Sequence, residues 1–243
     1  MGRLDVVHWG TDRLRVGPWR GDSSIAQIVP SAGQLPHPAT IERCVGELAA
    51  KGYRSALTSA LTYTEQQPFL DTGFVVHERL HLLRHDLESF SPNGPALDTP
   101  LRVRRGRRGD RDGALAVDRA AFSPFWRFDR RGLDDARAAT PSSRFRVVGD
   151  GRVIGYAVTG RAGAVGYLQR LAVFPDRQRR GLGRALVLDG LRWAKRRGAT
   201  SLLVNTQETN RPAVELYEHL GFTREAHGLA VLELPLEDSE ASA

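Results

Sequence analysis

The chain has few of the residues on which disulfide-stabilised, metal-binding and membrane proteins depend. Its 243 residues include one cysteine, Cys44, which excludes an intramolecular disulfide, and they contain no cysteine and histidine spacing typical of a zinc site. No apolar run is long enough to span a bilayer, and the first fifteen residues carry charges where the apolar part of a signal peptide would lie. We therefore expect a cytoplasmic protein with no metal and no membrane partner.

The composition is that of a soluble chain, with 41% hydrophobic and 26% charged residues, and the length allows one large or two small domains. Cys44 falls in an apolar pattern with Ile41 and Leu48, which favours a packed helix position over a nucleophile.

Charge is divided unequally between the two halves. Residues 1–99 contain nine basic and eleven acidic residues, net −2, whereas residues 100–243 contain 26 basic and 17 acidic residues, net +9. The second half is therefore expected to attract an anionic ligand or partner. Its most basic run, Arg102 to Arg111, lacks the interleaved aromatic residues that single-stranded nucleic acids require, so a solvated loop is favoured and nucleic acid is not expected as a partner.

Residues 89–100 are rich in turn-forming residues and have no apolar periodicity, which predicts a linker. The linker would separate a first domain, residues 1–88, from a second, residues 101–236. The short acidic tail, residues 237–243, is predicted to be disordered.

The second domain is expected to alternate strands and helices. Apolar spacing predicts helices over residues 110–122 and 133–139, and strands over residues 101–104, 145–149, 152–160 and 165–174. Asp150 and Gly151 predict a hairpin turn between two of these strands.

The most informative segment runs from Tyr167 to Leu186 and reads YLQRLAVFPDRQRRGLGRAL. An apolar strand leads into a glycine turn, and apolar residues at helical spacing follow the turn. Amide groups at a helix start lack partners within the helix and lie at the positive end of its dipole, so they bind anions. The segment therefore predicts a pyrophosphate site, the alternative being a plain basic turn. It is no P-loop, because no Gly-Lys-Ser/Thr follows, and Leu186 stands where a dinucleotide fingerprint has its third glycine.

Two motifs in order carry a family resemblance. The pattern V-x-P-x-x-Q-x-x-G-x-G runs from Val173 to Gly183, and N-x-x-A-x-x-L-Y-x-x-x-G-F runs from Asn210 to Phe222. Together they resemble the GNAT superfamily of acetyl-CoA-dependent N-acetyltransferases. The resemblance implies an α/β (α+β) fold in which helices flank a mixed central sheet, with acetyl-CoA as the acyl-donor substrate.

The resemblance also implies roles for individual residues. The backbone of Gln178 to Ala185 would bind the pyrophosphate, the strand around Leu171 and Val173 would pair with the pantetheine arm, and Asn210 would hold that arm. Tyr217 would donate a proton to the departing thiolate, since a tyrosine with a pKa near 10 stays protonated at pH 7; the alternative is a packed helix position. The expected acetyl-CoA contacts are Leu171, Ala172, Val173, Gln178, Arg179, Arg180, Gly181, Leu182, Gly183, Arg184, Ala185 and Asn210.

The general base is where this chain departs from the family. Many relatives have an acid on the strand before the turn, whereas this chain has Gln169 and Arg170 there. Glu208 is the nearest carboxylate to the motifs; Glu225 and His227 are weaker candidates, and a water relay is equally open. Freeing an amine at pH 7 costs about 4.6 kcal/mol for a lysine and about 1 kcal/mol for an α-amine. A peptide α-amine or small amine is therefore favoured over lysine as acceptor.

The acceptor pocket of such folds is shaped by the loop between the first two helices. Here that loop contains Phe125, Trp126 and Arg127, which we expect either to line the acceptor site or to close the core over the sheet.

The first domain repeats part of the second. Residues 49–58 resemble residues 195–204, and residues 69–74 resemble residues 218–222. We expect a smaller, degenerate or truncated GNAT-like half that binds no cofactor, although ordinary helix–glycine–strand patterns explain the likeness equally well. The alternatives for the whole chain are a mycothiol-synthase-like tandem enzyme, which acetylates a cysteinyl pseudo-disaccharide, or a non-catalytic acyl-CoA-binding protein. Nothing in the sequence indicates an oligomeric state.

Overall fold

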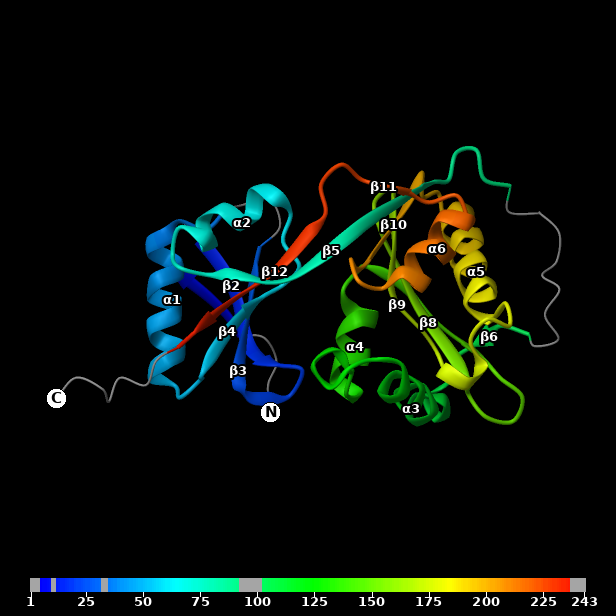
Figure 1. Ribbon diagram of the computed structural model, residues 1–243, viewed down its shortest axis with the longest axis horizontal. Helices are drawn as coiled ribbons and strands as arrows, with labels where there is room; N and C mark the ends of the chain where they lie inside the picture. Colours follow the sequence, from blue (N-terminus) through cyan, green and yellow to red (C-terminus); the bar gives the residue numbers. More distant parts are fainter. Residues whose placement is uncertain (1–4, 10–11, 32–34, 92–101, 237–243) are drawn as a thin grey trace. The chain divides into compact units, whose positions relative to one another are not determined.

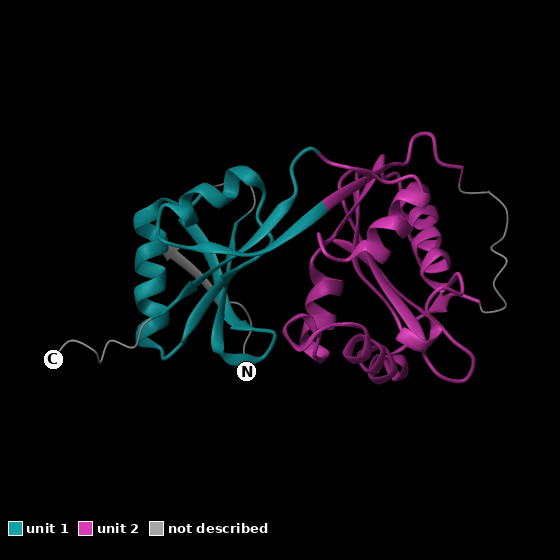
Figure 2. Ribbon diagram, in the orientation of Figure 1, with its two compact units in different colours: residues 1–81, 226–243 teal, residues 82–225 magenta. Residues whose placement is uncertain are grey.

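The computed structural model describes residues 5–9, 12–31, 35–91 and 102–236, which form two compact units (Figure 2). Unit 1 consists of Met1–His81 and Ala226–Ala243, and unit 2 of Leu82–Glu225. Most of the predicted linker and all of the predicted tail lie outside the described residues. Within the described part of the chain, no helix is both long enough and apolar enough to cross a membrane.

Among its described residues, unit 1 has a six-stranded sheet and two helices. The strands follow the order β1, β2, β3, β4, β12 and β5, in which only β3 and β4 are parallel. Helices α1 and α2 share one apolar core with the strands, and Cys44 is buried in it on α1, as expected, where burial raises the pKa of its thiol to about 12. The elements are β1 (Asp5–Trp9), β2 (Asp12–Trp19), β3 (Asp22–Pro30), α1 (Pro38–Ala50), β4 (Ser55–Thr58), α2 (Tyr63–Leu70), β5 (Val75–Asp86) and β12 (Leu229–Pro235).

The unit boundaries differ from the predicted domain boundaries. β12 lies near the end of the chain yet pairs with both β4 and β5, so it belongs to the sheet of unit 1 rather than to the predicted second domain. The chain passes from unit 1 to unit 2 within β5, a single strand of twelve residues. Neither feature has a local sequence signal, because strand pairing is set by residues far apart in the chain.

Unit 2 is a mixed sheet covered by helices on both faces (Figure 1). Its strands follow the order β5, β10, β9, β8, β7 and β6, and β11 pairs with β5. Tyr156 and Val158 of β8 pack in a core with α3 and α4, whereas Ala157, between them, packs in a second core with α5. The further elements are β6 (Arg104–Arg105), α3 (Arg111–Ala121), α4 (Arg130–Ala138), β7 (Ser142–Val148), β8 (Gly155–Ala162), β9 (Val165–Val173), α5 (Leu182–Arg196), β10 (Ser201–Gln207), α6 (Arg211–His219) and β11 (Thr223–Arg224).

The predicted element order of the second half is confirmed, with one notable difference in a turn. β7 ends at Val148 and β8 begins at Gly155, and the N–H of Ile154 donates to the carbonyl of Val148 at 2.9 Å, so the connection is longer than a two-residue Asp-Gly turn. The predicted strand over residues 152–160 includes Val153 and Ile154. Both are buried, but in the loop, where Val153 packs against Gly113 of α3.

The two units share the same backbone pattern at two helix ends. After α1 and after α5, a glycine with positive φ follows the last turn: Gly52 (φ +83°) and Gly198 (φ +79°). The next amide donates five residues back in both, at 3.2 Å from Tyr53 to Leu48 and at 3.0 Å from Ala199 to Ala194. This pattern is a common glycine-based helix end. The internal resemblance in the sequence therefore corresponds to a shared local structure.

Candidate acyl-donor and acceptor site

An opening between two neighbouring strands is the main feature of unit 2. The parallel pairing of β9 with β10 covers only Val165–Tyr167 and Ser201–Leu203. Within the described residues the two strands have no further register partners in each other, although β9 runs on to Val173 and β10 to Gln207. β9 stays paired with β8 on its other edge, with a register shift at Gln169, so one edge of β9 is left open beyond Tyr167.

The open edge presents backbone groups of Leu171 and Val173. The N–H of Phe174 donates to the carbonyl of Ile154 at 3.0 Å, on the β8 side. Because successive residues of a strand direct their backbone polar groups to opposite edges, those of Ala172 also point towards β8, and those of Leu171 and Val173 point to the open edge. The side-chain amide of Gln178 donates a hydrogen bond to the carbonyl of Val173 at 3.2 Å. The backbone groups of Leu171 and the N–H of Val173 thus point to the edge where a further strand-like ligand would pair, whereas the Val173 carbonyl already accepts from Gln178.

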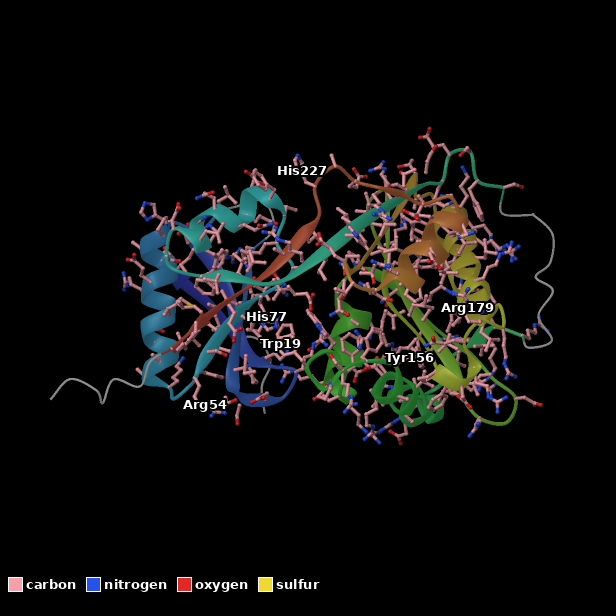
Figure 3. All side chains as sticks on the ribbon, in the orientation of Figure 1. Trp19, Arg54, His77, Tyr156, Arg179 and His227 are labelled. Atoms are coloured by element: carbon pink, nitrogen blue, oxygen red, sulfur yellow. The ribbon has the colours of Figure 1, made fainter. Side chains whose placement is uncertain are left out.

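The turn after β9 leads directly into α5. A 3₁₀ turn, Pro175–Arg177, is followed by Arg179 and Gly181, whose φ angles are +61° and +75°. Gly181 is the N-cap of α5, and the first intrahelical bond runs from the N–H of Ala185 to its carbonyl at 2.9 Å. The amides of the three residues between them begin the helix and so have no acceptor one turn earlier. Arg179, Arg180 and Arg184 are exposed around this helix start, and Figure 3 labels Arg179.

The two glycines of the turn serve different purposes. A Cβ at Gly181 would meet no atom within 4 Å, so glycine is required there by the positive φ alone. A Cβ at Gly183 would lie 3.2 Å from Cδ2 of Leu216 on α6. Gly183, which is among the expected acetyl-CoA contacts, therefore also lets α5 pack closely on α6.

Tyr217 lies on α6 in the same core as Leu182 of α5. Its side chain is buried at 5% exposure and packs against Phe222, with ring centroids 5.5 Å apart. Burial raises the pKa of its hydroxyl above the ordinary value of tyrosine. Among the described residues no group shares a hydrogen bond with that hydroxyl. Tyr217 is therefore a protonated donor without a protein acceptor.

Asn210 is the N-cap of α6 rather than a free side chain. Its Oδ1 accepts from the N–H of Ala213 at 3.4 Å, and its Nδ2 donates to Oγ1 of Thr206 on β10 at 3.1 Å. Both polar ends are thereby used to fix the start of α6 beside β10, and Tyr217 lies on that helix.

The candidate bases are spread over the chain. Glu208 is exposed in the short connection between β10 and α6, next to the open end of β10. Glu225 donates its backbone N–H to Leu82 at the end of unit 2. His227 belongs to unit 1, where its ring stacks on that of Tyr63 at 5.5 Å (Figure 3). Of the three, only Glu208 adjoins the opening.

A buried ion pair on the other face of the sheet was not found from the sequence. Arg170 of β9 donates twice to the carboxylate of Asp118 on α3, at 2.8 and 2.9 Å, and Asp118 is fully buried. The hydroxyl of Tyr156, a residue labelled in Figure 3, donates to the same carboxylate. Burial raises the pKa of that hydroxyl. The available signal was an acid on the apolar face of the predicted helix, which requires a cationic partner.

The same arginine holds the loop between α3 and α4. Its guanidinium lies 3.5 and 4.0 Å from the ring centroids of Phe122 and Phe128, and it donates to the carbonyl of Trp126 at 2.6 Å. The loop predicted to shape the acceptor site is thus attached directly to β9.

The three predicted acceptor residues are half-buried in this loop. Phe125 and Trp126 meet edge to face at 5.0 Å, and Nε of Arg127 donates to the carbonyl of Phe122 at 3.0 Å. No group of three or more metal-ligating side chains occurs among the described residues.

Comparisons with known proteins find one family model and a group of related acetyltransferases. Residues 115–222 match the sequence model of the acetyltransferase (GNAT) family. A mycothiol acetyltransferase of Thermomonospora curvata is 36% identical over 124 residues, which are 48% of this chain and 42% of that protein. A mycothiol acetyltransferase of Streptomyces avermitilis is 30% identical over 210 residues, 79% of this chain and 68% of that protein. In several such relatives the matched region spans about half of their length.

A solved structure shares the fold along nearly the whole chain. It is described as a tandem GNAT protein from the clavulanic acid biosynthesis pathway and superposes with a TM-score of 0.70 at 14% identity, covering 97% of this chain and 83% of that one. At this identity the likeness concerns the fold alone.

Proposed function

The chain belongs to the GNAT family of acetyltransferases, and on that premise we propose that unit 2 moves the acetyl group of acetyl-CoA directly to a primary amine. The amine is that of a small molecule or of a peptide N-terminus. The observation that carries the proposal is the open edge of β9 beside the glycine turn, which supplies a strand-like binding edge and an anion-binding helix start in one stretch of chain.

Acetyl-CoA is held in this proposal by backbone groups. The amides from Gln178 to Ala185 bind the pyrophosphate, and the exposed arginines of the turn add attraction for its charge. The pantetheine arm pairs with Leu171 and Val173 along the open edge. Asn210 acts indirectly, because its side chain is engaged in fixing the start of α6.

The transfer requires two proton movements. The neutral amine attacks the thioester carbon, a C–N bond forms, and the C–S bond breaks as the thiolate leaves. Tyr217 gives its proton to the sulfur and regains one from solvent, while the amine loses a proton to water, with Glu208 the nearest carboxylate to assist. Because burial raises the pKa of Tyr217, its hydroxyl stays protonated throughout the range in which the amine becomes neutral.

The ion pair of Arg170 bears on which amine is accepted. Arg170 stands where many relatives have an acid, and it is fully engaged with Asp118 and the α3–α4 loop, so neither member of the pair is free to take a proton. An acceptor amine whose proton is removed at lower cost near pH 7 needs less help from a base, which favours an α-amine, at about 1 kcal/mol, over a lysine, at about 4.6 kcal/mol. The cysteinyl amine of a mycothiol precursor meets this condition, and the names of the curated relatives make it the first acceptor to test.

The test is acetyl transfer by the full chain, followed by mass spectrometry of the product. Three acceptors are compared at equal concentration: a cysteinyl amino-sugar, a peptide with a free N-terminal alanine, and the same peptide with a blocked N-terminus and one lysine. We expect either α-amine to be acetylated at least tenfold faster than the lysine. Faster acetylation of the lysine would overturn the choice of acceptor, and binding of acetyl-CoA without transfer to any amine would favour the non-catalytic alternative.

A further inference from the structure

A strongly cationic cavity lies in unit 2 apart from the opening described above. It has a volume of about 720 Å³ and is bordered by β6, the start of α3, the end of α4 and the middle of β7. We propose that this cavity binds a second anionic ligand, one that carries two or more linked phosphate groups. Its lining consists of Arg104, Arg105, Gly106, Arg107, Arg108, Arg111, Arg137 and Phe145.

The cavity has more positive charge than its own carboxylates neutralise. Asp110 binds Arg104 through two bonds of 2.7 Å, which lowers the pKa of that carboxyl. Asp134 contacts Arg111 at 3.0 Å and Arg137 at 3.3 Å. Two carboxylates thus face six guanidinium groups.

Three of the six arginines have no ion-pair partner among the described residues. Arg105, Arg107 and Arg108 are exposed, and within the described part of the chain none of them forms an ion pair. Like charges gathered in this way repel one another and destabilise the fold, and a bound polyanion would relieve that repulsion.

The local backbone shapes the cavity around one aromatic ring. The N–H of Gly106 donates to the carbonyl of Phe145 at 2.9 Å, and a Cβ at Gly106 would lie only 2.2 Å from the ring of Phe145. Glycine at this position therefore allows β6 to lie against the ring, between arginines on both sides in sequence. The volume is within the range of small-molecule sites, about 300–1,000 Å³.

The lining favours phosphate over other anionic partners. Guanidinium groups match the oxygens of phosphate in a planar, two-bonded fork, and every cation in the cavity is an arginine. A single-stranded nucleic acid requires exposed aromatic faces for stacking, but Phe145 is only 6% exposed. A compact polyphosphate group needs no such surface.

The cavity is separate from the acetyl-CoA region in the fold. It lies at the edge of the sheet on β6 and β7, on the α3 and α4 side, whereas the pyrophosphate turn connects β9 to α5, two and three strands away. Binding at the cavity can therefore be measured while one equivalent of acetyl-CoA occupies the other region.

The experiment uses tripolyphosphate as the probe, with the full chain and one equivalent of acetyl-CoA, which fills the open edge first because its pantetheine arm also binds there under the proposed function. We expect tripolyphosphate to raise Tm and to bind calorimetrically at one equivalent per chain. The double variant Arg107→Gln/Arg108→Gln should weaken that binding at least tenfold. The matched control, Arg119→Gln/Arg152→Gln, removes the same charge from exposed positions of unit 2 outside the cavity and should bind as the parent does.

The remaining arms identify the ligand and can overturn the proposal. ADP that binds as tightly as tripolyphosphate indicates a nucleotide as the source of the phosphates, and ADP that binds more weakly indicates an inorganic polyphosphate; either supports the site. If the cavity variant and the control variant lose the same amount of tripolyphosphate binding, that binding is general charge attraction and the proposal is overturned. Duplex DNA is the last probe. If the chain binds duplex DNA more tightly than tripolyphosphate, and only the cavity variant loses that binding, the proposal is overturned in favour of a nucleic-acid surface. Because each readout is binding, failure here leaves the proposed acetyl transfer untouched.

Discussion

The two units of this chain share a helix–glycine–strand framework but differ at each point where acetyl-CoA chemistry is proposed. Gly73 and Gly221 follow α2 and α6 with φ angles of +89° and +86°. The next residue donates five positions back in both units, from Phe74 to Phe69 at 3.1 Å and from Phe222 to Tyr217 at 3.0 Å. Tyr217 and Phe69 therefore occupy the same position, and only unit 2 has a hydroxyl there.

The strands differ in how far they continue. In unit 1, the pairing of β3 with β4 ends at Thr58, which is also the last residue of β4. In unit 2, both β9 and β10 continue beyond their last pair, and this extra length forms the open edge. Among the described residues, the open strand edge at this position therefore belongs to unit 2, where both strands continue beyond their last pair.

The helix starts differ in charge. In unit 1 the carboxylate of Asp12 accepts from the N–H of His37 at 2.9 Å and from the hydroxyl of Thr40 at 2.7 Å, at the start of α1. The protein's own anion therefore occupies the position that the pyrophosphate is proposed to take at α5. We propose that unit 1 is a degenerate copy that binds no acetyl-CoA, and a calorimetric titration that saturates at two equivalents, with the arginine cavity disabled, would contradict this.

The largest effect, on kcat, is expected when the hydroxyl of Tyr217 is removed, which makes unit 2 resemble unit 1 at this position. We expect Tyr217→Phe to lower kcat by about 10²- to 10⁴-fold, because the thiolate loses its proton donor. The Tm should hardly change, since the hydroxyl has no partner among the described residues. The reverse change in unit 1, Phe69→Tyr, should leave kcat unaltered. Turnover by Tyr217→Phe at the parent rate would exclude this residue as the acid.

The next largest effect is expected on stability, from the ion pair between Arg170 and Asp118. Replacing Arg170 with Met leaves a fully buried carboxylate without its cation, which typically costs about 3–5 kcal/mol of unfolding free energy. Urea denaturation measures the loss. The double variant Asp118→Leu/Arg170→Met should recover much of it, because no charge then remains buried. If the double variant is less stable than Arg170→Met, the pair is not the cause.

A matched pair of glycine variants should separate binding from stability. Alanine is disfavoured by about 1 kcal/mol at the positive φ of Gly181 or of Gly52, so both variants strain a turn. We expect Gly181→Ala to weaken acetyl-CoA binding about fivefold to tenfold, as that energy implies. Gly52→Ala should lower Tm without changing acetyl-CoA affinity. Equal affinity in the two variants would show that the turn at Gly181 is only structural.

The smallest effect is expected at the start of α1. The Thr40 hydroxyl and the His37 amide lower the pKa of Asp12 below its ordinary value, so its carboxylate is favoured in the folded state. That contribution is present above the ordinary pKa and is lost as pH falls through the lower, folded value. Asp12→Asn should therefore cost about 1 kcal/mol near pH 7, as the loss of a helix cap does. The difference from the parent should shrink as pH falls through the folded pKa of Asp12, and a constant difference at all pH values would rule out the charge as its origin.

Local patterns in the sequence were enough to predict the strand, turn and helix around Gly181, because the turn chemistry and the apolar spacing lie within twenty residues. Local patterns did not predict the ion pair of Arg170 or the pairing of β12 with the strands of unit 1. Each joins residues that lie far apart in the chain, and Arg170 and Asp118 are separated by 52 positions. The sequence around one partner gives no sign of the other. The position of Tyr217 was expected from the family motif, but its equivalence to Phe69 became visible only through the hydrogen bonds that end α2 and α6.

The place of β12 has a consequence for the order in which the molecule is made. Unit 1 needs β12 between β4 and β5, yet β12 follows the whole of unit 2 in the chain. On the ribosome, residues 1–81 therefore emerge without the strand that lies between β4 and β5, and the facing edges of these two strands stay unpaired until unit 2 has been synthesised. Unit 2 can therefore finish folding first. Unit 1, which is proposed to bind no acetyl-CoA, completes its sheet last.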